Sequence, residues 1–259
     1  MALVPPIRPP IVQPLVPAYA TPKLPWEPDL GSVVFDPTQV PGRLLDLWAT
    51  VESTTITGSG VSSWRDQVAA YDFVQATNAN RPPFTASWRN GHPALDFNGT
   101  SQRVTHTFLA DELLAAGNDC TLYMFGELDT LSGVVDNTVI DFVNGAVLFI
   151  LQVAGALTAG WYDGAWQGTG LPATGAHSWC WALDSGVVNG STVYQDGVSL
   201  GTVTVTNNGL GGATFVGCES SPSALLDGKI GRLLLYSGLH DTVTRNNILG
   251  WGRGYYALP

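Results

Sequence analysis

Three aromatic residues and one carboxylate fall within six residues of the sequence, Trp161-Tyr162-Asp163-Gly164-Ala165-Trp166. An aromatic ring face beside a hydrogen-bond acceptor suits a pyranose ring, because it offers a rigid apolar surface next to a polar group. Trp161, Tyr162, Asp163 and Trp166 are therefore candidate glycan-binding residues. The alternative is that Trp161 and Trp166 pack in a core or at an interface, where aromatic residues are also enriched.

Nucleophilic and metal chemistry lack their usual sequence signs. The histidines, His92, His106, His177 and His240, occur singly, and no Gly-x-Ser-x-Gly motif is present. The three cysteines, Cys120, Cys180 and Cys218, are widely separated, which fits neither a disulfide framework nor a zinc site. We expect buried, reduced thiols, no catalytic residue, no metal and no cofactor.

The charge balance excludes other classes of function. Against 21 Asp and Glu stand only 11 Lys and Arg, for a formal net charge of −10, whereas nucleic-acid binding needs a clustered basic surface. A membrane span needs about 20 apolar residues, and the best run, 145–157, is interrupted by Gln152 and Gly155. The first ten residues lack a basic n-region and contain prolines, so we expect no secretory signal.

The N-terminal segment is predicted to be an extended arm, residues 1–40. Nine of the 17 prolines lie in its first 28 residues, and each fixes φ and removes an N–H donor. Apolar residues fill the spaces between them, unlike in a solvated linker. The arm is expected to dock on a neighbouring subunit or, alternatively, to fold back on its own domain. The residues expected to make the docking contacts are Pro5, Pro6, Ile7, Pro9, Pro10, Ile11, Leu15 and Trp26.

Residues 41–259 have the pattern of one all-β domain. Short apolar runs alternate with Asn-Gly and Asp-Gly pairs, which tolerate the positive φ of tight hairpin turns. About a dozen strands predict a two-sheet antiparallel sandwich. Strands are expected at 121–127, 134–142, 146–154, 155–162, 177–183, 191–195, 198–205, 213–217 and 229–236, and turns include Asn90-Gly91, Asp163-Gly164, Asp196-Gly197 and Asp227-Gly228.

Two short helices are expected within this domain. Residues 109–116 are rich in Leu, Ala and Glu and stop at Gly117-Asn118. Near the C-terminus, Asp241 or Thr242 is a candidate N-cap for a segment in which Thr244, Ile248, Trp251 and Tyr255 recur at helical spacing. We expect Trp251 to pack this second helix on the sandwich.

The order of motifs over residues 44–258 resembles the concanavalin A-like lectin/glucanase superfamily, in particular the laminin-G-like jelly-roll modules of bacteriophage virion proteins. Four segments carry the resemblance. They are Leu47-Trp48 with Val61-Ser62-Ser63-Trp64-Arg65-Asp66; Arg81-Pro82-Pro83-Phe84 with Asn90-Gly91-His92-Pro93-Ala94-Leu95-Asp96-Phe97-Asn98-Gly99; Thr192-Val193-Tyr194-Gln195-Asp196-Gly197; and Leu226–Tyr236 with the closing Tyr255-Tyr256-Ala257-Leu258. The resemblance implies a jelly roll with a terminal helix.

Two functional features of the family are incomplete here. Its glucanases carry an E-x-D-x-x-E strand; Glu127 and Asp129 begin this pattern, but Ser132 stands where the last Glu is required. Many laminin-G-like modules bind calcium at an acidic turn, which here reads Asn98-Gly99-Thr100-Ser101-Gln102-Arg103. We therefore predict a non-enzyme without calcium at that turn, while Asp136, Asp141 or Asp163 are left as weak alternatives.

The resemblance and the arm together predict a bacteriophage virion structural protein. It would be made in the host cytoplasm, form homo-oligomers, and be anchored to other capsid or tail proteins through its arm. The alternative is a receptor-recognition module of a tail fibre or spike, with the Trp161–Trp166 segment contacting host surface polysaccharide.

Overall fold

The computed structural model describes residues 35–129, 137–143, 147–150, 158–170, 172–220 and 224–259. Within these residues the chain forms two antiparallel sheets, two short 3-10 turns and a C-terminal α-helix. The all-β, two-sheet prediction is confirmed. The arm contacts predicted for Pro5, Pro6, Ile7, Pro9, Pro10, Ile11, Leu15 and Trp26 lie outside the described residues.

The first sheet, sheet A, has the strand order β15-β14-β13-β8-β17-β6-β5, with β1 also paired to β17. Its strands are β1 (Arg43–Trp48), β5 (Phe84–Arg89), β6 (His92–Asn98), β8 (Cys120–Leu128), β13 (Gly175–Leu183), β14 (Ser191–Gln195), β15 (Val198–Val203) and β17 (Asp227–Ser237).

The second sheet, sheet B, has the order β12-β11-β10-β9-β16-β7-β4-β3-β2. Its strands are β2 (Thr54–Thr57), β3 (Gly60–Arg65), β4 (Asp72–Val74), β7 (Val104–Thr107), β9 (Thr138–Phe142), β10 (Val147–Ile150), β11 (Gly160–Tyr162), β12 (Trp166–Gly168) and β16 (Ala213–Val216). The strands predicted at 134–142, 146–154 and 155–162 lie partly outside the described residues.

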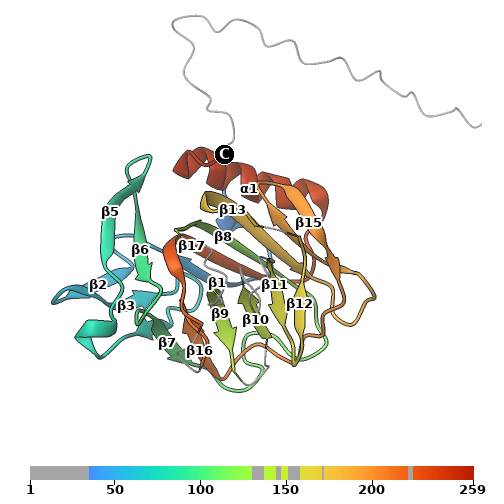
Figure 1. The fold of residues 1–259 in the computed structure, drawn as a ribbon, viewed down its shortest axis with the longest axis horizontal. Helices are drawn as coiled ribbons and strands as arrows, with labels where there is room; N and C mark the ends of the chain where they lie inside the picture. The colour runs from blue at the N-terminus through green and yellow to red at the C-terminus, as the bar shows by residue number, and fades with distance from the viewer. Residues whose placement is uncertain (1–34, 130–136, 144–146, 151–157, 171, 221–223) are drawn as a thin grey trace, which may run out of the picture. The chain divides into compact units, whose positions relative to one another are not determined.

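The layers follow from the alternation of side chains along each strand. In β8, Leu122 and Met124 belong to the core between the two sheets, whereas Tyr123 and Phe125 belong to a second apolar cluster on the outer side of sheet A. Figure 1 shows α1 (Thr242–Tyr256) lying over that outer side, so the order of layers is helix, sheet A, sheet B.

The C-terminal helix forms where the sequence predicts it. Asp241 accepts a hydrogen bond from the Thr244 N–H at 2.7 Å, which makes it the N-cap. Ile248 and Leu249 are buried in the outer cluster, and Trp251 packs against it as predicted. No helix in the described ranges is both long and apolar enough to cross a membrane.

Two local predictions are wrong. Residues 109–116 form turns instead of a helix, because the Leu113 and Leu114 N–H groups bond to the Leu210 carbonyl in place of the preceding turn. Asp227-Gly228 is not a turn but the start of β17. There a Cβ on Gly228 would collide with the Glu127 carbonyl of β8, so this glycine permits the close approach of two strands.

The hairpin turns and the thiols agree with the sequence. Asn90-Gly91 joins β5 to β6 and Asp196-Gly197 joins β14 to β15, all four residues with positive φ. The three cysteines are free and buried. Burial raises the pKa of the Cys180 and Cys218 thiols to about 12, so they are protonated at neutral pH.

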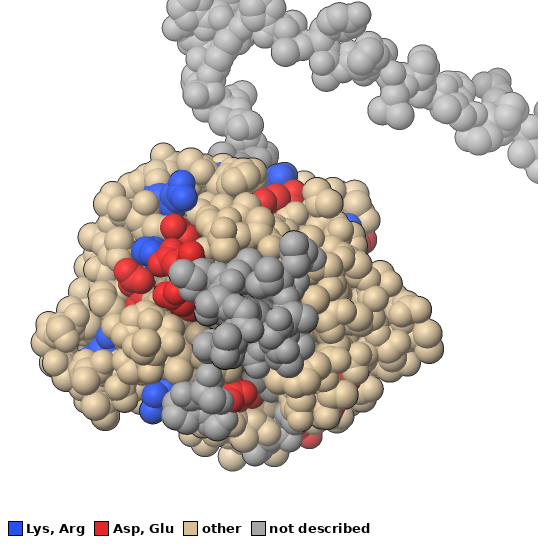
Figure 2. Space-filling view, in the orientation of Figure 1, with Lys and Arg blue, Asp and Glu red and all other residues tan. Residues whose placement is uncertain are grey.

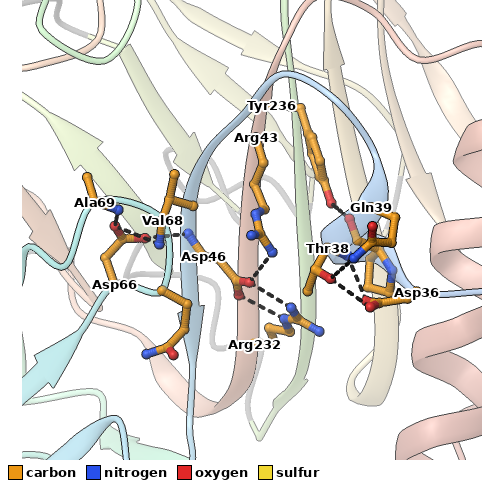
Figure 3. A network of polar contacts seen from close by, with 12 residues as sticks. Asp36, Thr38, Gln39, Arg43, Asp46, Asp66, Val68, Ala69, Arg232 and Tyr236 are labelled. Carbon is orange, nitrogen blue, oxygen red and sulfur yellow. Dashed lines mark hydrogen bonds and ion pairs between the residues drawn. The ribbon is translucent and has the colours of Figure 1, made fainter.

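A buried ion pair joins β1 to β17 beneath the helix. Arg232 donates from Nε and Nη2 to the two carboxylate oxygens of Asp46 at 2.8 and 2.7 Å, and each side chain is 1% exposed. Arg43 donates to the same carboxylate at 2.8 Å, as Figure 3 shows. The guanidinium packs against the rings of both Trp48 and Trp251, with centroids 4.1 and 4.8 Å away, so the pair also contacts α1.

The residues just before β1 contact the sandwich. Phe35 and Val40 pack against the cluster beneath α1, and the Tyr236 hydroxyl donates to the Pro37 carbonyl at 2.8 Å. Asp36 caps the 3-10 turn Pro37–Gln39 by accepting from the Thr38 N–H at 2.8 Å. Residues 35–40, which the sequence places in the arm, therefore contribute to the packing of sheet A.

Candidate functional site

The aromatic segment forms the hairpin β11–β12. The strands pair so that Tyr162 lies opposite Trp166, and directly opposite residues project from the same face of a sheet. Their ring centroids are 4.8 Å apart in an edge-to-face arrangement, and Trp166 is 39% exposed. The two rings thus form a partly exposed aromatic pair on the outer face of sheet B, the face turned away from sheet A.

Trp161 does not take part in this surface. Because successive side chains of a strand point to opposite faces, it projects from the other face than Tyr162 does. Trp161 is fully buried in the core between the sheets. The sequence left two interpretations of Trp161, glycan binding and core packing. Core packing is the one observed, so Trp161 is not part of the surface site.

Asp163 positions the hairpin. Its Oδ2 accepts the Thr206 N–H at 2.8 Å, and its backbone carbonyl accepts from the Asn208 amide nitrogen at 3.1 Å. Its Oδ1 accepts the Ala165 N–H at 3.3 Å within the turn. The carboxylate therefore ties the aromatic hairpin to residues 206–208, and its role is mainly to orient Tyr162 and Trp166.

A row of paired residues extends from the hairpin across sheet B. Starting from the hairpin, Tyr162 pairs with Leu148, and Leu148 pairs with Asp141. Asp141 pairs in turn with Phe215, Phe215 with Thr105, and Thr105 with Val74. From β12 to β4 the row crosses seven strands, or about 29 Å at about 4.8 Å per strand. Phe215 keeps part of its surface exposed and Val74 is 47% exposed. The row therefore aligns Phe215 and Val74 with the aromatic pair.

Asp141 stands in the middle of that row but is 2% exposed. Burial raises the pKa of its carboxyl to about 6, although the Ser220 N–H donates to its Oδ2 at 2.7 Å. Sequence reasoning selected neither Phe215 nor Val74. The alternation of buried and exposed residues in their strands could have shown that both side chains point outward. Their alignment with Tyr162 could not be seen, because it depends on the pairing of strands that are distant in the sequence.

The carboxylates of the incomplete glucanase pattern lie on the outer face of sheet A. Glu127 accepts from the Trp88 indole N–H at 2.5 Å. Lys229, opposite Glu127 in β17, pairs with Asp129 at 2.9 Å and with Asp96 at 3.8 Å. Figure 2 shows acidic and basic side chains gathered together on a face that is otherwise mostly uncharged. Contacts within the sheet thus account for both Glu127 and Asp129.

No group of three or more His, Cys, Asp or Glu residues is arranged to hold a metal ion among the residues that the structure describes. Of the weak calcium alternatives, Asp141 and Asp163 both accept backbone N–H groups, and Asp136 lies outside the described residues.

The sequence matches no protein-family model and no curated protein. Among solved structures, domain 4 of AbnA, an extracellular GH43 arabinanase from Geobacillus stearothermophilus in complex with arabinotriose, is 15% identical with a TM-score of 0.56, covering 80% of this chain and 98% of that domain. A botulinum neurotoxin type C structure, concerned with cell entry through two ganglioside molecules, is 9% identical with a TM-score of 0.57, covering 82% of this chain and 51% of that one.

A Trypanosoma rangeli sialidase in complex with 2,3-difluorosialic acid is 17% identical with a TM-score of 0.51, covering 93% of this chain but 37% of the sialidase. This chain therefore spans about a third of the sialidase and about half of the neurotoxin chain. At these identities the likeness establishes the fold, a β-sandwich of the kind found in glycan-binding and glycosidase proteins. It confirms the β-sandwich fold that the motifs imply.

Proposed function

We propose that this protein is a non-catalytic glycan-binding module whose ligand lies on the outer face of sheet B. The observation that carries the proposal is the partly exposed pair Tyr162–Trp166, held on a short hairpin by Asp163. Rigid aromatic rings lose little conformational entropy on binding, and an apolar ring face with polar groups nearby complements a sugar ring. The arabinotriose complex of the similar arabinanase domain supports the proposal.

The module is proposed to be non-catalytic because glycoside hydrolysis needs two carboxylates flanking the scissile bond. On the proposed face, Asp163 is engaged by backbone N–H groups, and Asp141 is buried. Glu127 and Asp129 lie on the other sheet, in contact with Trp88 and Lys229. These contacts favour structural roles for all four carboxylates.

A neutral glycan is the favoured ligand. The chain carries a formal net charge of −10, and the Asp163 carboxylate lies in the turn beside the aromatic pair. A sialylated or uronic-acid chain would meet like charge there, which lowers its affinity relative to a neutral chain. Binding to immobilised neutral and sialylated glycans of matched length distinguishes the two classes.

Trp166→Ala is expected to weaken glycan binding about 30-fold, the effect of removing an aromatic anchor worth about 2 kcal/mol. Trp166→Phe is the matched control, since it retains a ring, and it should keep most of the affinity. Binding is measured by isothermal titration against the best glycan of the panel. Equal affinities of the wild type and Trp166→Ala would contradict the proposed site. Trp161 is left intact in these variants because it is part of the core.

The virion role stays a prediction, and its test is a truncation. A deletion of residues 1–34 keeps the contacts of Phe35, Pro37 and Val40, so the sandwich is expected to retain the stability that these contacts supply. Removing residues 1–40 should lower it.

If the arm is the anchor, only the full-length chain will co-sediment with particles that lack this subunit. Equal sedimentation of the 1–34 deletion would place the contact on the sandwich itself.

A further inference from the structure

His177 contacts two hydrogen-bond acceptors at the start of β13. Its Nδ1 lies 2.6 Å from Oδ2 of Asp196, and its Nε2 lies 3.0 Å from the Thr174 carbonyl oxygen. The side chains of His177 and Asp196 are 15% and 20% exposed. The imidazole therefore bridges Thr174, which precedes β13, and the turn that joins β14 to β15.

These two contacts require two protons on the ring. A carbonyl oxygen only accepts hydrogen bonds, and a neutral imidazole has a single N–H to donate. An ionised carboxylate likewise only accepts, and the other oxygen of Asp196 receives the Ser178 N–H at 2.9 Å and the Ser178 hydroxyl at 3.1 Å. Only the imidazolium can donate to both partners. Losing one proton therefore breaks one of the two contacts and, whichever nitrogen keeps its proton, removes the ion pair with Asp196.

Other charged groups near His177 come from two further elements. Arg89, at the end of β5, disfavours the imidazolium. Arg253 of α1 donates from Nη1 to the Asp196 backbone carbonyl at 3.0 Å, so the turn that His177 holds is also attached to the helix. The hydrogen bond to Asp196 outweighs burial and Arg89, and it raises the pKa of His177 above its usual value of 6.5.

We propose that His177 is a pH-responsive latch, closed as the imidazolium and opened by loss of its proton, that joins Thr174 to the Asp196-Gly197 turn and, through Asp196, to α1. The latch is independent of the proposed glycan site on sheet B, so either can fail without the other.

The direction of the pH dependence follows from the two partners. Because the folded pKa of His177 is raised, its contribution to stability is complete below pH 6.5 and is lost as the pH rises through the folded pKa. Burial raises the pKa of Asp196, but the bonds from His177 and Ser178 prevail and hold it below 3.8, so its contribution is lost only in stronger acid. The latch is therefore strongest between pH 3.8 and pH 6.5, where Asp196 is ionised and His177 is protonated.

The test is a histidine titration of the full chain by NMR. The His177 ring is expected to titrate above pH 6.5, while His92 and His240, whose pKa values burial lowers, titrate below it and serve as internal references. In Asp196→Asn the proton affinity of His177 should fall about tenfold or more, since the opposite charge is gone. Titration of His177 at or below pH 6.5 in the wild type would overturn the proposal.

Amide hydrogen exchange tests the opening itself. After correction for the intrinsic pH dependence, exchange of the Ser178 N–H, which donates to Asp196, should accelerate as the pH rises through the His177 titration. In His177→Gln this acceleration should be absent, because the glutamine does not titrate. A Ser178 exchange rate that shows no step at the His177 titration in the wild type would contradict a latch, even if the pKa is raised.

Discussion

Asp46→Ala is expected to lower the free energy of unfolding by about 3–5 kcal/mol, the typical effect of removing one partner from a buried ion pair. The variant leaves the Arg232 guanidinium, 1% exposed and packed against Trp48 and Trp251, without its carboxylate. The loss is measured by urea unfolding at neutral pH, followed by tryptophan fluorescence.

Two further variants identify the cause of that loss. Arg43→Ala removes a partner of Asp46 that is 18% exposed, and it should lower stability by about 1 kcal/mol or less. The double variant Asp46→Leu, Arg232→Met replaces both charges and should be more stable than Asp46→Ala, because no charge is left buried and unpaired. If Asp46→Ala destabilises the protein no more than Arg43→Ala does, the unpaired Arg232 guanidinium is not the cause of the loss.

Gly252→Ala is expected to destabilise the protein by about 1–3 kcal/mol. Gly252 is buried on the inner face of α1, where an added Cβ would overlap the ring of Phe125 in β8, so the helix or the ring must shift. The expected result is a lower unfolding temperature together with altered signals from the ring of Phe125 in the NMR spectrum.

Gly250→Ala is the matched control on the same helix. Nothing lies within 4 Å of its added Cβ, and alanine favours the helix by about 1 kcal/mol over glycine, so this variant should raise stability. The two alanine substitutions, two residues apart, therefore have opposite signs. Equal effects of the two would mean that α1 is not packed on Phe125 as described.

Local chemistry made parts of the fold predictable. Asn90-Gly91 and Asp196-Gly197 form hairpin turns because a tight turn requires positive φ and these residues tolerate it, and Asp241 begins the helix because its side chain caps it. Where tertiary contacts override local preference, prediction fails. The Leu-rich stretch 109–116 bonds to Leu210 instead of forming its own helix, and Gly228 serves strand packing in place of a turn.

In the candidate site, too, local sequence pattern predicts some residues, and contacts between distant strands determine the others. Strand alternation alone separates Trp161 from Tyr162, so the sequence could have assigned them to opposite faces. The row through Phe215 and Val74 could not be predicted, since it depends on the register of strands distant in the chain. Asp46 has apolar neighbours on both sides in its strand and Arg232 on one side, which signals burial of a charge, but their 186-residue separation hides the pairing.

The measurement that tests the proposed function most directly is a map of backbone chemical-shift changes on titration with a neutral glycan selected from the panel. Changes are expected to concentrate in β11 and β12 around Tyr162 and Trp166 and to continue along the row to Phe215. Changes centred instead on Glu127 and Lys229 of sheet A, or no binding to any neutral or sialylated glycan, would contradict the proposed function.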